Sequence, residues 1–348
     1  METLGGSEFA PDTTYLNTAM CGLLPARAVT VMNTLLAELA AGRPGGSGEF
    51  TVLEAVRESF ARIAGVGPER VAVGGSVSVH AGLIANSLPP GAEVLFPEGE
   101  YSSVVTPFAV RGDLRLRYAP LEDLAGAIRP GTALVAFSMV QSADGRIADR
   151  AAIRAAAAAH GTRTLVDASQ SAGWLPLDAG EWDFTVTAGF KFLLCARGVS
   201  FLTVGEEAGE TVTPIHAGPF AAADLWGQPY GPVPELAGTA RRFDEAPAFL
   251  VYHGAQASLA LLEEIGIGAV HAHATALARD LRDGVEALGH RAVPGESAIV
   301  ALPGLGGRAA ALSGAGIVVS ERGGNLRLAF HLHNSAADVA RVLEVLSV

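Results

Sequence analysis

Short apolar runs that alternate with helix-like segments between about residues 28 and 235 place the strongest limit on the fold of this chain. Each run ends at a polar residue or a glycine, as buried strands do. The runs cover residues 71–73, 93–96, 133–137, 164–166, 184–187 and 200–204. Residues 121–128 and 151–160 have the pattern of crossover helices, which parallel strands require. The alternation therefore predicts an α/β domain with a mainly parallel sheet.

The last third of the chain predicts a smaller α+β domain. Helices are expected over residues 248–262, 270–288 and 335–346, with short strands around 298–302, 316–319 and 325–331. We divide the chain into an N-terminal segment packed near the active site, a large domain and a small C-terminal domain, at residues 1–25, 26–240 and 241–348. Between the domains, residues 213–234 are rich in Gly, Pro and aromatic side chains and are expected to form an irregular loop that lines a site.

The composition limits the partners of the protein. Of 348 residues, 49% are hydrophobic, which is enough to bury a substantial core. The 36 acidic and 24 basic residues give a formal charge of −12 without basic runs, so nucleic acid is not an expected partner. No apolar stretch is long enough to span a membrane and no signal peptide is visible, and the low cysteine count indicates the reducing cytoplasm as the expected location. Two cysteines, Cys21 and Cys195, form neither a disulfide framework nor a four-ligand metal site, and no metal is expected.

Lys191 is the single lysine among the 24 basic residues. Lysine is normally one of the commonest residues, and a coding bias toward arginine explains its depletion without explaining why one copy remains. An arginine can replace lysine in surface ion pairs, but its guanidinium does not deprotonate and cannot act as an amine nucleophile. Lys191 is therefore the first candidate for chemistry.

Asp167 follows a predicted buried strand in the stretch TLVDASQ, residues 164–170, where ligands bind in open α/β sheets. Its alternative role is to cap a following helix. Lys191 lies 24 residues further on among Phe and Leu side chains, where partial desolvation would lower the pKa of its amine and favour the nucleophilic form. The alternative for Lys191 is a surface residue whose stem lies on apolar neighbours.

A Gly/Ser turn leads from the strand at residues 71–73 into a helix-like segment at residues 79–88. Free backbone N–H groups and hydroxyls at a helix N-terminus form a cradle for a phosphate, although such turns are common. A phosphate cradle, a carboxylate for a pyridinium nitrogen and a lysine for an imine together match the needs of pyridoxal 5′-phosphate (PLP). No Gly-x-Gly-x-x-Gly follows a strand, which argues against a nicotinamide enzyme.

With these motifs the chain resembles the class V aminotransferase group of fold-type-I PLP enzymes, which includes cysteine desulfurases, kynureninases, isopenicillin N epimerase-like proteins and ergothioneine-type C–S lyases. The resemblance extends over almost the whole chain, through YLNTA at residues 15–19, DASQSAG at 167–173, GFK at 189–191 and LRLAFHLHN at 326–334. It implies a PLP-binding large domain with a mainly parallel sheet, a smaller C-terminal α+β domain, and a homodimer with each site near the subunit boundary.

The resemblance also implies roles for individual residues. Lys191 would form the internal aldimine and later move the Cα proton, Asp167 would keep the pyridine nitrogen protonated, and Gln170 would bond the phenolic oxygen of the ring. The phosphate would be held by Ser76, Val77 and Ser78. Tyr101 stands where relatives stack a His or Phe on the ring, with a core-packed loop aromatic as the alternative. For the substrate, the implied ligands are Asn17 and Arg327; Arg327 would clamp the α-carboxylate, unless it forms a structural ion pair.

The chain departs from the family at several positions. Phe190 stands where many relatives have a histidine before the lysine, and Cys195-Ala196 replaces a Gly-Pro pair. Residues 245–248 read EAPA where relatives often place a Gly-Thr-Pro-Asn segment whose hydroxyl reaches the phosphate of the neighbouring subunit, which indicates that phosphate binding is partly rewired. Desulfurases carry a catalytic cysteine shortly before the carboxylate-binding arginine, but residues 318–324 contain none. Persulfide chemistry is therefore not expected.

We expect a PLP-dependent enzyme that acts on a small amino-acid substrate by α,β-elimination, as a C–S β-lyase on a cysteine S-conjugate. The alternatives are epimerisation, transamination or decarboxylation-linked deamination on the same cofactor, and a binding protein of this fold without catalysis. Four histidines lie in segments that could approach the site, where one could protonate a leaving group, although each is first expected to be a structural or surface residue: His216, His253, His331 and His333. Aromatic residues of the loop at 220–230 are expected to shape specificity.

Overall fold

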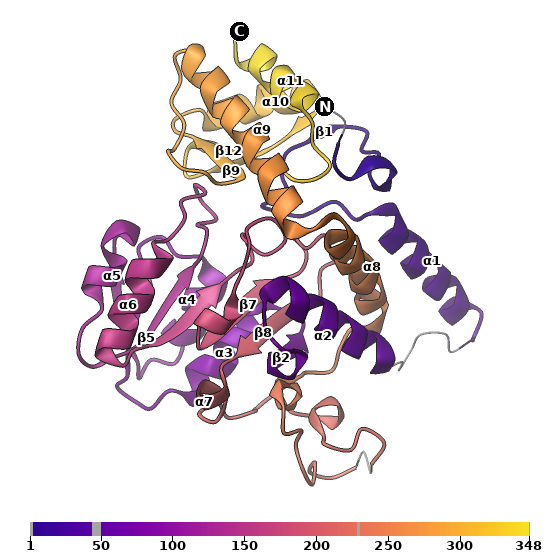
Figure 1. Cartoon of the computed structure of the whole chain (residues 1–348), viewed down its shortest axis with the longest axis vertical. Helices are drawn as coiled ribbons and strands as arrows, with labels where there is room; N and C mark the ends of the chain where they lie inside the picture. The colour runs from indigo at the N-terminus through magenta and orange to yellow at the C-terminus, as the bar shows by residue number, and fades with distance from the viewer. Residues whose placement is uncertain (1–2, 44–49, 228–229, 348) are drawn as a thin grey trace.

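The computed structural model describes residues 3–43, 50–227 and 230–347 and shows a large α/β part with a smaller α+β part above it (Figure 1). The large part is built on a seven-stranded sheet of order β2-β8-β7-β6-β5-β3-β4. Neighbours from β4 to β7 are parallel, whereas β8 runs antiparallel to both β7 and β2. The strands are β2 (Val71–Gly74), β3 (Glu93–Pro97), β4 (Arg115–Ala119), β5 (Thr132–Ser138), β6 (Arg163–Asp167), β7 (Phe184–Ala188) and β8 (Ser200–Val204).

Helices bury the sheet on both faces. Successive residues of a central strand point into different cores: Val135 and Phe137 of β5 lie in one hydrophobic cluster, and Leu134 and Ala136 in the other. Near-continuous apolar runs are the sequence pattern of such doubly covered strands. One face is covered by α2 (Phe50–Ala64), α6 (Arg150–His160) and α8 (Phe249–Ile265), and the other by α3 (Val77–Ser87) and α4 (Ser102–Ala109). The long helix α1 (Ala26–Ala40) packs along α8.

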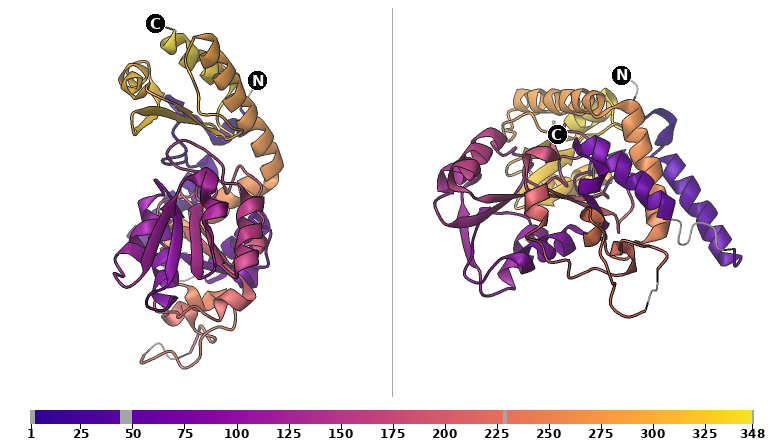
Figure 2. Two further views of the ribbon diagram at one scale, coloured as in Figure 1. Left: turned by 90° about the vertical axis from the view of Figure 1, so that its left-hand side faces the viewer. Right: turned by 60° about the horizontal axis from the view of Figure 1, so that its bottom comes forward.

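The small part carries a three-stranded antiparallel sheet of order β11-β12-β9. Its strands are β9 (Ile299–Leu302), β11 (Ser320–Arg322) and β12 (Asn325–Ala329), and its helices are α9 (Ile267–Ala287), α10 (Ala309–Gly314) and α11 (Ala336–Leu346). The N-terminal strand β1 (Thr14–Tyr15) pairs in parallel with β10 (Ile317–Val318). The start of the chain is thereby attached to the small part, beside the junction with the large sheet (Figure 2).

The fold class predicted from the sequence is confirmed, and all six expected strands of the large sheet are present. The edge strand β4 was missed because its sequence, RLRYA, is polar and mostly half-buried or exposed, so it lacks an apolar run. The crossover expected at residues 121–128 is a short 3₁₀ turn followed by one turn of helix, α5 (Leu124–Ala127). The loop expected at 213–234 is irregular over its described residues; residues 228 and 229 lie outside them. No helix among the described residues is long and apolar enough to cross a membrane.

Candidate functional site

A cavity of about 210 Å³ lies where β6 and β7 end, at the edge of the sheet where open α/β folds bind ligands. Its wall brings together Asp167, Lys191, Tyr101 and the Gly75–Val77 turn, which are far apart in the sequence. A larger cavity of about 520 Å³ lies within the loop at 217–235 and is lined by that loop alone, without a lysine, arginine or histidine. The smaller cavity is therefore the candidate active site.

Lys191 lies on a tight turn between β7 and β8, and its side chain is almost completely buried. Its Nζ is 5.1 Å from the centroid of the Tyr101 ring and 6.0 Å from that of Phe190. Burial lowers the pKa of Lys191 to about 8; Asp167 raises this pKa in part, while the nearby cations Arg327 and Arg197 lower it further. A buried amine that loses its proton near neutral pH is equipped to act as a nucleophile. The alternative of a snorkelling surface lysine is wrong.

This lowered pKa predicts how the apoprotein takes up an aldehyde. Because the neutral amine is the nucleophile, the rate of covalent attachment of PLP to Lys191 is expected to rise with pH and to level off above about pH 8, instead of near the 10.5 of an ordinary lysine. Stopped-flow absorbance between pH 7 and 10.5 measures this rate while the cofactor phosphate keeps its charge. A rate that still rises tenfold between pH 9 and 10 contradicts the low pKa.

Asp167 is the last residue of β6. Its Oδ1 accepts a hydrogen bond of 2.8 Å from the backbone N–H of Ser169, and the Ser169 hydroxyl accepts one of 2.8 Å from the N–H of Ala188 at the end of β7. The carboxylate is thus held in a turn, and no helix begins directly after β6, so the helix-cap alternative is wrong. The second carboxylate oxygen accepts no hydrogen bond from the described residues. Asp167 can therefore offer it to a ligand in the cavity.

The N-terminus of α3 forms the expected cradle. Ser76 is the N-cap, and its Oγ accepts a hydrogen bond from the N–H of Val79 at 3.4 Å and lies 3.1 Å from the Oγ of Ser78. Gly75, Ser76 and Val77 line the cavity, whereas Ser78 does not. The first N–H groups of a helix lack intrahelical partners, and those of Ser76, Val77 and Ser78 make no hydrogen bond to a described residue, so they are available to an anion, whereas the N–H of Gly75 donates to Glu245.

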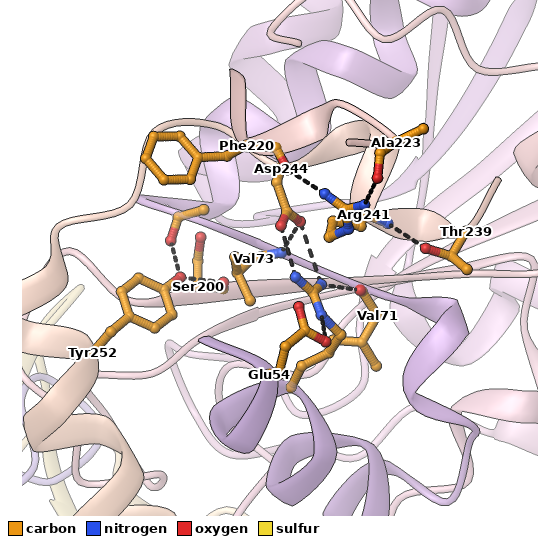
Figure 3. A network of polar contacts seen from close by, with 12 residues as sticks. Glu54, Val71, Val73, Ser200, Phe220, Ala223, Thr239, Arg241, Asp244 and Tyr252 are labelled. Atoms are coloured by element: carbon orange, nitrogen blue, oxygen red, sulfur yellow. Dashed lines mark hydrogen bonds and ion pairs between the residues drawn. The ribbon is translucent and has the colours of Figure 1, made fainter. Parts of the chain in front are cut away.

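A network behind the cradle holds β2, as Figure 3 shows for Val71, Val73, Asp244 and Tyr252. Asp244 accepts a hydrogen bond from the N–H of Val73 at 2.8 Å and pairs with the buried Arg57 guanidinium at 2.7 Å, which also donates to the Val71 carbonyl. The Tyr252 hydroxyl donates to the Gly74 carbonyl at 2.9 Å. The strand that ends at the cradle is therefore held by buried side chains from three other segments.

Arg327, on β12, is buried and has no ion pair to an acidic side chain among the described residues. Its Nε donates to the Ser320 hydroxyl at 3.2 Å and its Nη1 to Ser142, while Nη2 is buried and makes no hydrogen bond. Burial lowers the pKa of Arg327 to about 10 because no carboxylate compensates the charge. The structural ion-pair alternative is wrong. An unpaired guanidinium that keeps free donors is suited to a carboxylate ligand.

Gln170, Asn17 and Arg327 do not line this cavity. The Gln170 amide donates to the Ala19 carbonyl and to the Ser142 hydroxyl, both at 2.9 Å, and its oxygen is buried without a partner. Asn17 bridges to Ala329 on β12, and its side-chain oxygen is also buried without a partner. Gln170 therefore contacts a cofactor ring only if its present hydrogen bonds rearrange. Tyr101, in contrast, lines the cavity and is 46% exposed, so the core-packed alternative is wrong.

Sequence reasoning missed two residues at the site. Ser142 joins Arg327 to Gln170 through its hydroxyl, and Arg197 lines the cavity beside Lys191. Neither lies in a recognisable motif; the only available signal was their position after a predicted strand or next to Lys191. The loop residues Phe220 and Trp226 do not line this cavity, because their rings pack on Phe50.

The histidines have structural surroundings. His331 is fully buried, with Nε2 at 2.9 Å from the Phe192 carbonyl and Nδ1 accepting from the N–H of Leu332, and burial lowers its pKa to about 3. His333 is buried beside it, and burial lowers its pKa to about 4. Both rings are neutral at neutral pH. His216 is exposed, and His253 lies in α8, as expected. Among the described residues no cluster of His, Cys, Asp or Glu could hold a metal ion.

Known proteins resemble this chain at several levels. A family model described as aminotransferase class-V matches residues 47–304. An isopenicillin N epimerase of Streptomyces clavuligerus is 31% identical over 66% of this chain and 65% of that protein. The uncharacterised aminotransferase YcbU of Bacillus subtilis is 30% identical over 65% of this chain and 63% of that protein, and a kynureninase of Deinococcus radiodurans is 31% identical over 62% and 55%. This chain thus spans less than two thirds of the length of these relatives.

Solved structures share the fold over nearly the whole chain. The complex of the cystine C–S lyase C-DES with its reaction product cysteine persulfide has a TM-score of 0.87, with 23% identity over 97% of both chains. The apo cysteine desulfurase of Thermococcus onnurineus NA1 has a TM-score of 0.82, with 22% identity over 97% of this chain and 94% of that one. At these identities the likeness establishes the fold.

Proposed function

Because the chain belongs to the aminotransferase class-V family, we propose that it is an enzyme that acts on amino acids at the cavity of Lys191. The cofactor is PLP, as in that family. The donor set around the cavity fits it: a helix N-terminus for the phosphate, a carboxylate with a free oxygen for the ring nitrogen, and a buried amine without a hydrogen-bond partner among the described residues for the aldehyde. This combination in one cavity is the observation that supports the proposal.

When bound, PLP supplies an electron sink for the pair left at Cα when one of its bonds breaks. The residues of this chain would bind the cofactor and move the protons. Lys191 would hold the cofactor through its aldehyde and would move the Cα proton, because its amine exchanges a proton near neutral pH. The Asp167 carboxylate would hold a proton at the ring nitrogen, and the turn of Ser76, Val77 and Ser78 would bind the phosphate. Tyr101, which lines the cavity, would pack against the ring.

Substrate binding is proposed for Arg327 and Asn17. Arg327 has a buried donor without a partner and no ion pair within the described part of the chain, so a substrate α-carboxylate would supply the missing charge. Asn17 is brought close by its bridge to Ala329, two residues from Arg327, and also keeps a buried oxygen unpaired. Both groups are thus ready to bind the amino-acid end of a substrate.

We propose α,β-elimination on a cysteine S-conjugate as the reaction. The conjugate and one water give a free thiol, pyruvate and ammonium. When the C–S bond breaks, its electron pair goes to the sulfur, which then takes up a proton. The proposal is supported by the segment before Arg327, where Ser320 and not a cysteine contacts the guanidinium. Cys195 is fully buried, and burial raises the pKa of its thiol, so it is no nucleophile. A thiolate can therefore leave without a protein persulfide.

Epimerisation is the second candidate, favoured by the 31% identity to an isopenicillin N epimerase. It needs only Cα proton transfer, which Lys191 would also perform. Transamination and decarboxylation-linked deamination remain further alternatives. A binding protein without catalysis is disfavoured because Lys191, Asp167 and Arg327 are all present and unblocked by ion pairs among the described residues.

The test is a product analysis with purified holoenzyme and a panel of cysteine S-conjugates. Elimination is expected to release pyruvate, ammonium and thiol in equal amounts. Deuterium uptake at Cα without pyruvate identifies an epimerase instead, and a keto acid with conversion of PLP to its amine form identifies an aminotransferase. Either result overturns the lyase assignment and keeps the PLP assignment.

The assembly, location and domain limits are also proposals. We propose a homodimer, supported by large exposed side chains such as Trp226, 81% exposed, and Tyr230, 85% exposed, which a partner would cover. We retain the cytoplasm as the location and residues 1–25, 26–240 and 241–348 as the division. In space, α8 belongs with the large part, since it covers one face of the large sheet and packs on α1 and α2, and the small part begins at α9.

A further inference from the structure

The phosphate end of the cavity has no cation among the residues assigned so far. The Gly75–Val77 turn offers N–H groups and a hydroxyl, but a phosphate carries nearly two negative charges. Phe190 stands in place of the histidine that many relatives have, and the EAPA segment contains no threonine. The chain therefore needs another group to balance this charge.

A carboxylate near the cradle makes this need greater. Glu245 accepts a hydrogen bond from the N–H of Gly75, so an acidic side chain of the EAPA segment already contacts the turn that would receive the phosphate. Two anions at one helix N-terminus repel each other, and a cation close to both of them offsets this repulsion. A cation at this place would allow the phosphate to bind beside Glu245 or to displace it.

The register of the sheet brings Arg197 to this end of the cavity. β8 pairs antiparallel with β2, and Ser200 lies opposite Gly74. Continuing outward from that pair, Gly75 and Val199 both line the cavity, and Arg197 lies two residues beyond Val199. The turn also touches the α8 end of the EAPA segment, because a side-chain carbon added at Gly198 would lie 3.5 Å from Val251. Arg197 therefore lines the same cavity as the Gly75–Val77 turn.

The side chain of Arg197 is free to bind an anion. Its Cζ lies 4.1 Å from the centroid of the Phe190 ring, a stacking that leaves the in-plane N–H donors unused. It is exposed, lines the cavity, and has no hydrogen bond or ion pair to another described residue. Arg327 is the other unpaired arginine near Lys191, but it lies on β12 of the small part.

We propose that Arg197 binds the phosphate of PLP and completes the anion cradle of this chain in place of the family's missing ligands. The assignment rests on the proposed function, since it presumes PLP in this cavity. Phe190 then has a role too: its ring supports the guanidinium where a histidine would otherwise donate. The stacked, planar fork suits the two-point binding of phosphate oxygens.

The experiment compares two aldehydes in Arg197→Ala, Arg197→Lys and the wild type. PLP carries the phosphate and 5′-deoxypyridoxal lacks it, while both react with Lys191. Arg197→Ala is expected to raise the Kd for PLP about 10- to 100-fold, as for loss of a charged hydrogen bond, and to leave the Kd for 5′-deoxypyridoxal unchanged. Inorganic phosphate is expected to slow PLP binding to the wild type and to lose this effect in the variant. Arg197→Lys is expected to restore part of the affinity.

The outcomes separate the role of Arg197 from the proposed function of the protein. Arg154→Gln serves as the matched control, because Arg154 is an exposed arginine paired with Glu181 outside the cavity, and it is expected to bind PLP as the wild type does. An unchanged PLP Kd in Arg197→Ala, or an equal loss for both aldehydes, overturns the assignment of Arg197 alone. A raised KM for dicarboxylic substrates with an unchanged PLP Kd assigns Arg197 to the substrate and also overturns it. A wild type that reacts with neither aldehyde contradicts the proposed function itself.

Discussion

Lys191→Ala is expected to lower turnover by at least about a thousandfold, the size of effect found when a catalytic nucleophile or base is removed. The chain has no second lysine that could replace it. Burial gives this amine a pKa of about 8, so it is the group able both to attach to the PLP aldehyde and to move a proton at Cα. The variant is expected to bind PLP without the visible band of covalently attached cofactor, as absorbance measures directly.

Lys191→Arg is the matched control because it keeps the positive charge and removes the nucleophile. It is expected to fail in the same way as Lys191→Ala, which separates covalent attachment from electrostatics. Borohydride reduction of wild-type holoenzyme is expected to fix the cofactor on one peptide, the one containing Lys191. Fixation elsewhere, or full turnover in Lys191→Arg, would disprove the role of this lysine.

How much of the fold could be predicted depended on burial. Strands covered on both faces, such as β5 and β6, are recognisable because hydrophobic residues fill both sides. The edge strand β4 alternates arginines with apolar residues, and its pairing with β3 depends on neighbours that the local sequence does not specify. Helix and strand limits elsewhere differ from expectation by only a few residues, as at β12 and α9.

The residues of the candidate site likewise include some that could be recognised from the sequence and some that could not. Lys191 and Asp167 were recognisable from the local sequence, because one is the single lysine and the other is a carboxylate directly after a buried strand. They follow neighbouring strands, β7 and β6, at the same edge of the sheet. Ser142 and Arg197 were not recognisable, because their positions depend on contacts over long sequence distances: Ser142 meets Arg327 185 residues away, and Arg197 reaches the cradle through the pairing of β8 with β2. Gln170 was expected on the ring, yet its amide is engaged by Ala19 from the N-terminal segment. A sequence motif specifies the residue but not these competing partners.

Asp244→Ala is expected to lower the free energy of unfolding by about 3 to 5 kcal/mol, because it leaves the buried Arg57 guanidinium with only the half-exposed Glu54 carboxylate, 3.5 Å from its Nε, as a charged partner. It also removes the acceptor for the N–H of Val73 on β2, which is one of the two edge strands of the large sheet. Urea unfolding followed by circular dichroism measures the loss. Glu181→Ala, which breaks the exposed pair with Arg154, is the control and is expected to cost less than about 1 kcal/mol.

The double variant Arg57→Met with Asp244→Leu tests why the pair is there. Replacing a buried ion pair by apolar residues of similar size is often neutral, since no charge remains to be desolvated. Here the pair also supplies hydrogen bonds to the Val71 carbonyl and the Val73 N–H, so the double variant would leave both backbone groups buried and unsatisfied. We therefore expect it to stay clearly less stable than the wild type, and its PLP affinity to fall because the cradle begins two residues after Val73. Wild-type stability in the double variant would show that the pair does not support the strand edge.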